Sequence, residues 1–106
     1  MSFHGYYRIA PIREDGNEGE ITEISDREGV EEAMAIAANP ENWEGEEAVT
    51  VTHIVFDDDY DGKGGNDIVS ENTIAFFGTP EAWAKRKDWN VMAADIRPFA
   101  PKKDNA

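Results

Sequence analysis

The chain contains no cysteine and has no apolar run of the roughly 18 residues that a membrane-spanning helix needs. Without cysteine it can form neither a disulfide nor a thiolate-based zinc site, so its stability has to come from packing. Its first residues also lack the basic and apolar segments of a signal peptide. These absences predict a cytoplasmic protein with no membrane segment.

Positive charge is scarce in most of the chain, and negative charge is in large excess. The 23 Asp and Glu residues against 10 Lys and Arg give a net charge of −13. Residues 14–81 hold 20 of the acids and only two cations, Arg27 and Lys63, whereas both ends are net basic. A field of one sign attracts a surface of the other. The pattern therefore predicts a cationic partner and disfavours direct binding to nucleic acid, whose phosphates would be repelled.

The length of 106 residues and the apolar content of 40% fit a single folded domain. We expect this domain to span residues 1–101 and to be followed by a flexible tail, residues 102–106. Residues 6–12, 48–56, 68–77 and 91–99 are rich in the β-branched and aromatic side chains of strands. The second and third of these strands are expected to form a hairpin with a long connection.

The first predicted helix lies between the first two strands. Ser25 and Glu28 have the spacing of a capping box, and apolar residues recur every third or fourth position over residues 30–37. The pair Asn39-Pro40 then ends the helix, because the residue before a proline disfavours helical backbone. Glu28, Glu31 and Glu32 are expected on its polar side.

The second predicted helix begins with a Thr79 cap and Pro80 in the first turn, and extends to about residue 88. Lys85, Arg86 and Lys87 are expected in solvent at its negative carboxyl end. The resulting α+β order, β-α-β-β-α-β, is that of the ferredoxin-like fold, an antiparallel sheet with two helices on one face. A short extra strand over residues 20–24, paired with the first strand, is the alternative that would change this order.

A calcium site is one hypothesis for the connection after residue 56. The opening of a calcium loop, with carboxylates at alternate positions before a glycine, is matched by Asp57, Asp59, Asp61 and Gly62. The match ends there, because position 12 is Ile68 instead of the bidentate Glu. Asp67 could close a different oxygen cage. A solvated acidic hairpin tip is the alternative.

The sequence offers little for catalysis. It has no cysteine and two histidines, and His53 falls on the strand face of Val49 and Val51, where we expect a histidine hydrogen-bonded in or beside the core. Pairs of carboxylates are expected by chance among 23 acids. We therefore predict a protein that is not an enzyme and has no cofactor.

The acidic residues themselves are the predicted contact surface for a partner. Carboxylates at alternate positions of an extended segment recur about every 6.7 Å, comparable to neighbouring phosphates. The predicted partner-binding residues are Asp57, Asp58, Asp59 and Asp61 in the hairpin connection, Glu41, Trp43, Glu44, Glu46 and Glu47 after the first helix, and Glu28, Glu31 and Glu32 on it. Trp43 is either an exposed interface anchor or a plug at the end of the core. The hypothesis requires that folding gathers the acids into one continuous face.

In size and charge the chain resembles the nucleic-acid mimics with which bacteriophages block host defences, including anti-CRISPR and anti-restriction proteins, and the immunity proteins that neutralise nuclease toxins. The resemblance covers overall character and no alignable motif. It implies an inhibitor that occupies the basic surface of a nucleic-acid-handling protein, in the host cytoplasm if phage-encoded. The alternatives are a protein-interaction or assembly module with an incidental acidic surface, and a calcium-binding domain. The sequence leaves the oligomeric state open.

Overall fold

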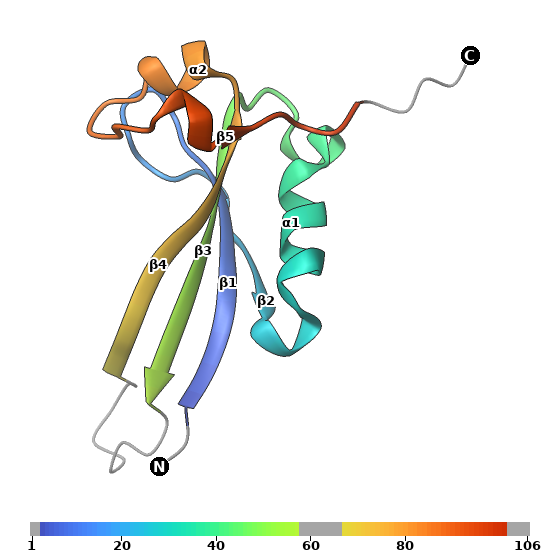
Figure 1. The fold of residues 1–106 in the computed structure, drawn as a ribbon, viewed down its shortest axis with the longest axis vertical. Coiled ribbons are helices and arrows are strands. Elements are labelled where there is room, and N and C mark those ends of the chain that lie inside the picture. The colour runs from blue at the N-terminus through green and yellow to red at the C-terminus, as the bar shows by residue number, and fades with distance from the viewer. Residues whose placement is uncertain (1–2, 58–66, 102–106) are drawn as a thin grey trace.

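The computed structural model describes residues 3–57 and 67–101. These residues form a mixed five-stranded sheet in the order β2-β1-β3-β4-β5 and two α-helices. The strands are β1 (Phe3–Pro11), β2 (Thr22–Ser25), β3 (Ala48–Asp57), β4 (Asp67–Gly78) and β5 (Ile96–Arg97), and the helices are α1 (Val30–Ala38) and α2 (Pro80–Ala84). α1 lies alongside the long strands, and α2 lies at one end of the sheet (Figure 1). The prediction of a small α+β domain is confirmed.

After β1 the chain turns back and forms β2, which pairs with β1 in antiparallel register, with Tyr6 opposite Ser25. Side chains of β2 alternate as a half-buried strand requires. Ile24 packs against the core, and Glu23 is exposed. This is the extra strand that the sequence offered as the alternative, displaced by two residues from its predicted start.

The sheet does not have the predicted ferredoxin-like order. In that order the first helix returns the chain so that the strands before and after it run parallel, with another strand between them. Here β2 reverses the chain once more before α1. β3 therefore enters antiparallel to β1 and pairs with it directly, from Phe3 opposite Asp57 to Pro11 opposite Val49. β5 runs parallel to β4, so the sheet is mixed and not purely antiparallel.

Ser25 caps a short 3₁₀ helix, η1 (Asp26–Glu28), and not α1. Its Oγ accepts the backbone N–H of Arg27 at 3.2 Å. Gly29 follows with a φ of 92°, a conformation that favours glycine, and α1 begins at the next residue. Ala33 and Ala37 of α1 are fully buried in the core formed with β1 and β3. Their small side chains let the helix approach the sheet closely.

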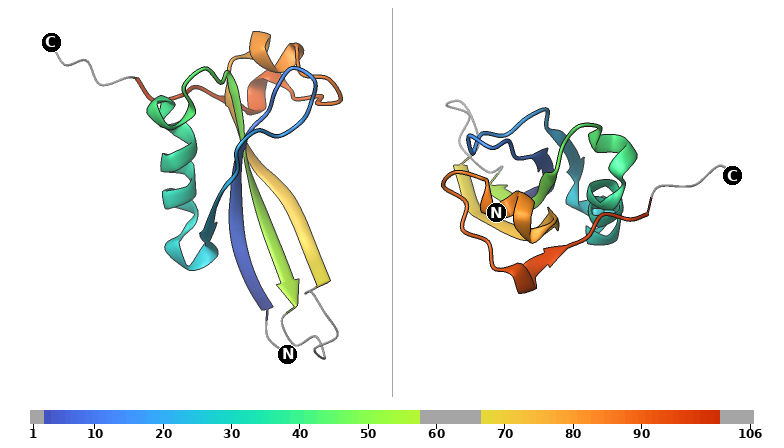
Figure 2. Two further views of the ribbon diagram at one scale, coloured as in Figure 1. Left: turned by 180° about the vertical axis from the view of Figure 1, so that it is seen from behind. Right: turned by 90° about the horizontal axis from the view of Figure 1, so that it is seen from above.

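α2 packs on the opposite face of the sheet from α1. Its Trp83 contacts Ile12 and Ala48, and Ala48 alternates along β3 with Val49, which belongs to the core under α1. The prediction that both helices share one face is therefore wrong. Figure 2 shows α2 at the same end of the molecule as the loop between β1 and β2, away from the hairpin end.

The predicted start of α2 is confirmed, but its length is not. The Oγ1 of Thr79 accepts the N–H of Ala82 at 3.1 Å, and Pro80 occupies the first turn. The helix ends at Ala84 instead of near residue 88. Of the last predicted strand, residues 91–99, only the two residues of β5 form a strand. A 3₁₀ helix, η3 (Ala93–Asp95), precedes them.

β3 and β4 form the predicted hairpin, whose connection, residues 58–66, lies outside the described residues. The predicted tail, residues 102–106, lies outside them too. The pairing of β4 with β3 shifts register twice, which leaves Val69 and Ile74 as extra residues at β-bulges. Both side chains are exposed.

Candidate functional site

Five carboxylates lie on the side of the molecule formed by η1, α1 and the 3₁₀ helix η2 (Pro40–Trp43). Residues 28–57 contain no Lys or Arg, and none of the five forms an ion pair with another described residue. All are exposed except Glu46, which is half-buried. We call this set the acidic flank: Glu28, Glu32, Glu41, Glu44 and Glu46.

The part of the flank that follows α1 is fixed by a buried tryptophan. Trp43 is only 7% exposed, and its Nε1 donates to the backbone oxygen of Ile36 in α1 at 3.1 Å. The Oδ1 of Asn39 caps η2 by accepting the N–H of Glu41 at 3.0 Å. The structure therefore favours Trp43 as a plug of the core and not as an interface anchor. It holds η2 in place, so the acids of this segment project from an ordered backbone.

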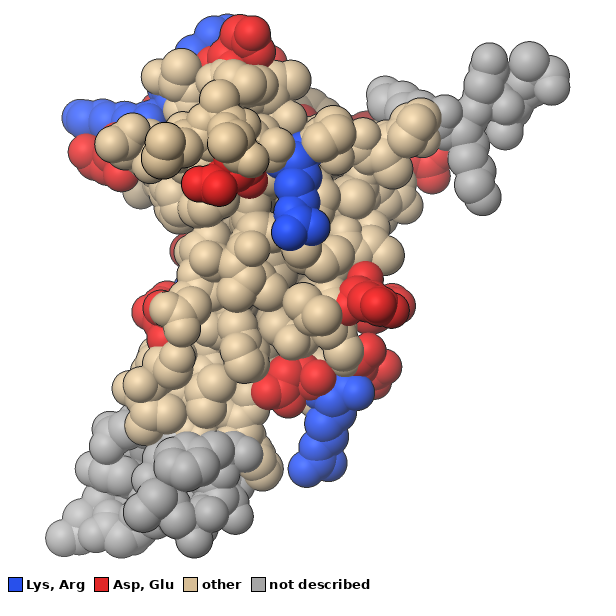
Figure 3. Space-filling model, in the orientation of Figure 1, with Lys and Arg blue, Asp and Glu red and all other residues tan. Residues whose placement is uncertain are grey.

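The acidic side chains of the described residues do not form one continuous face. Glu28 of η1 and Glu32 in the first turn of α1 form one group, whereas Glu41, Glu44 and Glu46 follow the end of the helix, so residues 33–38 of α1 separate the two groups. Figure 3 shows Asp and Glu on the α1 side, on the β4 side and at the upper end of the molecule, with largely uncharged surface between them. The described residues therefore lack the single acidic face that the hypothesis requires, and the acidic flank is one of several separate acidic regions.

The other predicted contact residues are placed elsewhere. The Oε2 of Glu47 accepts a hydrogen bond from Nη1 of Arg86 at 3.4 Å, and Glu31 lines an apolar groove. Asp58, Asp59 and Asp61 lie outside the described residues, as do the side chains of Asp57 and Asp67. The calcium hypothesis therefore falls wholly on side chains that the structure does not describe.

An apolar groove lies between α1 and β4, beside the acidic flank. Its volume is about 720 Å³. Its apolar lining consists of Val30, Met34, Ala35 and Ala38 of α1 and Ile74 and Phe77 of β4. The two charged residues of the lining are Glu31 and Arg97. The middle of the face in Figure 3, between β4 and α1, is largely uncharged.

On the other face of the sheet the charges are paired. The Nη2 of Arg8, on β1, donates to Oε1 of Glu71, on β4, at 2.5 Å, and its Nη1 lies 3.7 Å from Oε1 of Glu18. Burial and the neighbouring carboxylate of Glu23 raise the pKa of Tyr6 on the same face, although Arg8 opposes this shift. We call Arg8, Glu18 and Glu71 the paired cluster.

Arg86 is a structural cation that the sequence did not identify. Instead of lying in solvent it is 6% exposed. Its Nε donates to the backbone oxygen of Ile12 at 2.9 Å, and its Nη1 donates to that of Ala82 at 3.2 Å. The side chain thereby links α2 to the end of β1.

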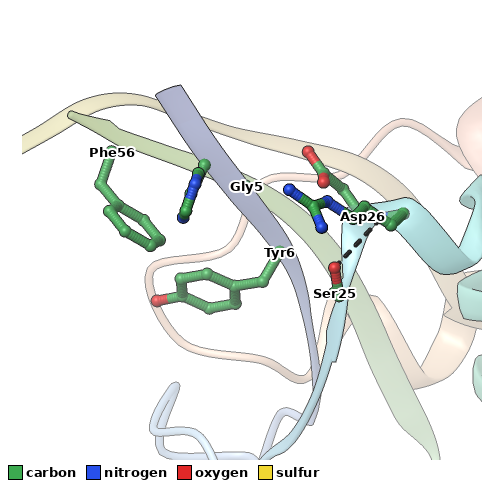
Figure 4. Close-up of a pocket in the computed structure, with 7 residues that line it drawn as sticks. Gly5, Tyr6, Ser25, Asp26 and Phe56 are labelled. Atoms are coloured by element: carbon green, nitrogen blue, oxygen red, sulfur yellow. Dashed lines mark hydrogen bonds between the residues drawn. The ribbon is translucent and has the colours of Figure 1, made fainter. Parts of the chain in front are cut away.

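A pocket of about 340 Å³ lies at the hairpin end of β1, with Tyr6 and Phe56 on one side and Ser25 and Asp26 on the other (Figure 4). A Cβ at Gly5 would stand 2.1 Å from Oδ2 of Asp26, so only glycine lets this carboxylate approach β1.

The Asp26 carboxylate at this pocket is hydrogen-bonded to a histidine. Its Oδ2 lies 3.2 Å from Nε2 of His53, whose ring packs on Tyr7 with centroids 4.9 Å apart. The prediction of a hydrogen-bonded histidine beside the core is confirmed. The pair ties η1 to the sheet. The Oγ of Ser25 caps η1, so the fold itself explains why Ser25 lies at this pocket.

Residues 3–57 and 67–101 contain no group of three or more His, Asp or Glu placed to hold a metal ion. No helix in the same residues is both long and apolar enough to cross a membrane.

Comparison of the chain with protein-family models, with curated proteins and with solved structures found no match.

Proposed function

We propose that the protein is a small, non-enzymatic binding protein of the cytoplasm whose acidic flank occupies the basic surface of a nucleic-acid-handling protein and blocks it. The observation that carries the proposal is the acidic flank itself, five carboxylates without a described ion-pair partner in a segment of 30 residues that contains no cation. Anti-defence inhibitors and nuclease immunity proteins are the classes of blocker that fit this description.

Electrostatics supports this assignment. A cationic groove that exchanges its bound counterions for protein carboxylates gains the same entropy as when it binds nucleic acid. Long-range attraction also speeds the encounter of oppositely charged surfaces.

The ordered backbone of the flank supports the assignment in a second way. Trp43 and the Asn39 cap fix the segment that carries Glu41, so this part of the flank loses little backbone freedom when it binds. Preorganisation of this kind raises affinity by lowering the entropic cost of association.

The proposal is tested with two variants of equal net charge. The flank variant carries Glu28→Gln, Glu32→Gln, Glu41→Gln, Glu44→Gln and Glu46→Gln. The control variant neutralises five exposed acids outside the flank, through Glu14→Gln, Asp15→Asn, Glu81→Gln, Asp88→Asn and Asp95→Asn. Each protein is immobilised and exposed to the heparin-binding fraction of source-cell lysate, and retained proteins are eluted with double-stranded DNA.

We expect the wild type and the control variant to retain the same basic protein, which DNA displaces. The flank variant should bind it at least about fivefold more weakly, since five exposed charge contacts contribute about 0.2–1 kcal/mol each. An equal loss of binding in both variants would show that the net charge of the protein, and not the position of the flank, determines the affinity. Retention that DNA does not displace would contradict a blocker of nucleic-acid binding.

A further inference from the structure

The groove between α1 and β4 is a part of this sheet face that the described residues cover incompletely. α1 packs mainly over β1 and β3, and α2 lies on the opposite face. On β4, Ala75 and Phe77 are buried in the core under α1, whereas Ile74 at the bulge is exposed. Val30 and Ile74 remain 42% and 37% exposed at the groove as a result.

The α1 wall of the groove has the form of a helix-packing surface. Val30, Met34 and Ala38 line it at spacings of four residues, which places them in one row along the helix. Rows of this kind interlock when two helices pack in the commonest arrangement of globular proteins. The groove thus presents a ridge that a second helix of the same kind can pack against.

Opposite charges lie toward opposite ends of this groove. Glu31 is in the first turn of α1. Arg97 is in β5, three residues before Ala100, whose N–H donates to the backbone oxygen of Ala38 at the end of α1. Neither charge forms an ion pair with another described residue.

We infer that two copies of this chain associate through this groove, with α1 of each copy packed against α1 and β4 of the other about a two-fold axis. Contacts in a two-fold interface are reciprocal. An antiparallel arrangement of the helices then places Glu31 of each copy beside Arg97 of the other, so one arrangement pairs both charges and covers Val30 and Ile74. The acidic flank of each copy stays on the outside of the dimer.

The net charge of −13 on each copy opposes the association. Salt screens this repulsion, so dimerisation strengthens as salt rises. Binding of the acidic flank to a cationic partner has the opposite dependence. Each proposal can therefore be disproved without the other, because dimerisation is measured on the purified chain without a partner.

Sedimentation equilibrium of the full chain tests the inference, from about 1 to about 100 µM at about 0.15 M and about 0.5 M NaCl. We expect a reversible monomer–dimer equilibrium that shifts toward dimer at the higher salt. Glu31→Arg and Arg97→Glu should each weaken dimerisation at least about tenfold, and the double variant Glu31→Arg/Arg97→Glu should restore it. Ala35→Glu, an exposed position of the groove, should also prevent it.

Glu32→Arg and Lys85→Glu are the matched controls, because they make the same changes in net charge at exposed residues that do not line the groove. Glu31→Arg lowers the net repulsion, so weaker association of this variant cannot come from net charge. Far-ultraviolet circular dichroism checks that every variant is folded. A chain that is monomeric throughout, or a dimer that neither single swap weakens, or a double variant that does not recover, would overturn the inference.

Discussion

The acidic flank and the paired cluster differ in whether their carboxylates form ion pairs with described residues. In the paired cluster, Arg8 contacts both Glu18 and Glu71 and so connects β1 to β4 and to the loop before β2. In the acidic flank, no carboxylate has a described cation within ion-pair distance. Like charges left unpaired contribute repulsion and no attraction within the fold. The difference indicates that the acids paired with Arg8 contribute to the stability of the fold, whereas those of the flank do so little.

The largest expected effect concerns the buried cation. Arg86→Ala should lower the free energy of unfolding by about 2–4 kcal/mol, because the backbone oxygens of Ile12 and Ala82 lose their donor in a buried site. Urea denaturation followed by circular dichroism measures this loss. Glu47→Gln, at the exposed end of the same contact, is the control and should cost less than about 0.5 kcal/mol. Similar values for both variants would show that Arg86 is not structural.

A smaller effect is expected in the paired cluster. Glu71→Gln should lower the free energy of unfolding by about 0.5–1 kcal/mol, because half of this side chain is exposed and solvent weakens its pairing with Arg8. Glu14→Gln, an exposed acid without a described ion pair, provides the comparison and should leave stability nearly unchanged. If Glu14→Gln is the more harmful change, the distinction between paired and unpaired acids is wrong.

The five substitutions of the flank variant together should change the free energy of unfolding by less than about 1 kcal/mol. Relief of repulsion stabilises the variant, and the loss of acids from first helical turns, where they interact favourably with the helix dipole, destabilises it. Urea denaturation of the flank and control variants should give curves close to the wild type. Cooperative unfolding at much lower urea would mean that the flank maintains the fold.

The sequence predicted the elements of this fold better than their arrangement. Strand and helix positions follow from local periodicity, and the Thr79 cap was recognisable from its neighbours. The sheet order depends on whether residues 22–25 pair with β1, and a strand of four residues has too weak a local signal to decide this. Once β2 forms, the direction of every later strand is reversed relative to the ferredoxin-like order.

The acidic segment was identifiable from the sequence, but its division was not. Charge counting located the excess acid, whereas the separation of the flank into two groups depends on α1 lying between them. The spacing of Arg86 from Ala82 and Trp83, four and three residues, is a sequence signal for its burial, although α2 itself ends at Ala84. The groove depends on which face receives α2, and that is a tertiary property.

The smallest expected effect is a pH dependence on the face of the paired cluster. Burial and Glu23 raise the pKa of Tyr6 in the folded state. Tyr6 therefore stabilises the fold fully below its unfolded pKa of about 10, and this contribution is lost as pH rises through the higher folded pKa. Alkaline titration of tyrosinate absorbance should show a late-ionising component that Tyr6→Phe removes and Glu23→Gln shifts downward. No change of the Tyr6 titration in Glu23→Gln would remove this carboxylate as a cause.

The salt dependence of partner binding tests the central claim most directly. The dissociation constant of the captured basic protein is measured for the wild type, the flank variant and the control variant over a series of NaCl concentrations. The account predicts a steep loss of affinity with salt for the wild type and the control variant, and a clearly shallower slope for the flank variant, because fewer counterions are exchanged. Equal slopes for the flank variant and the wild type would contradict the claim that the acidic flank makes the contact.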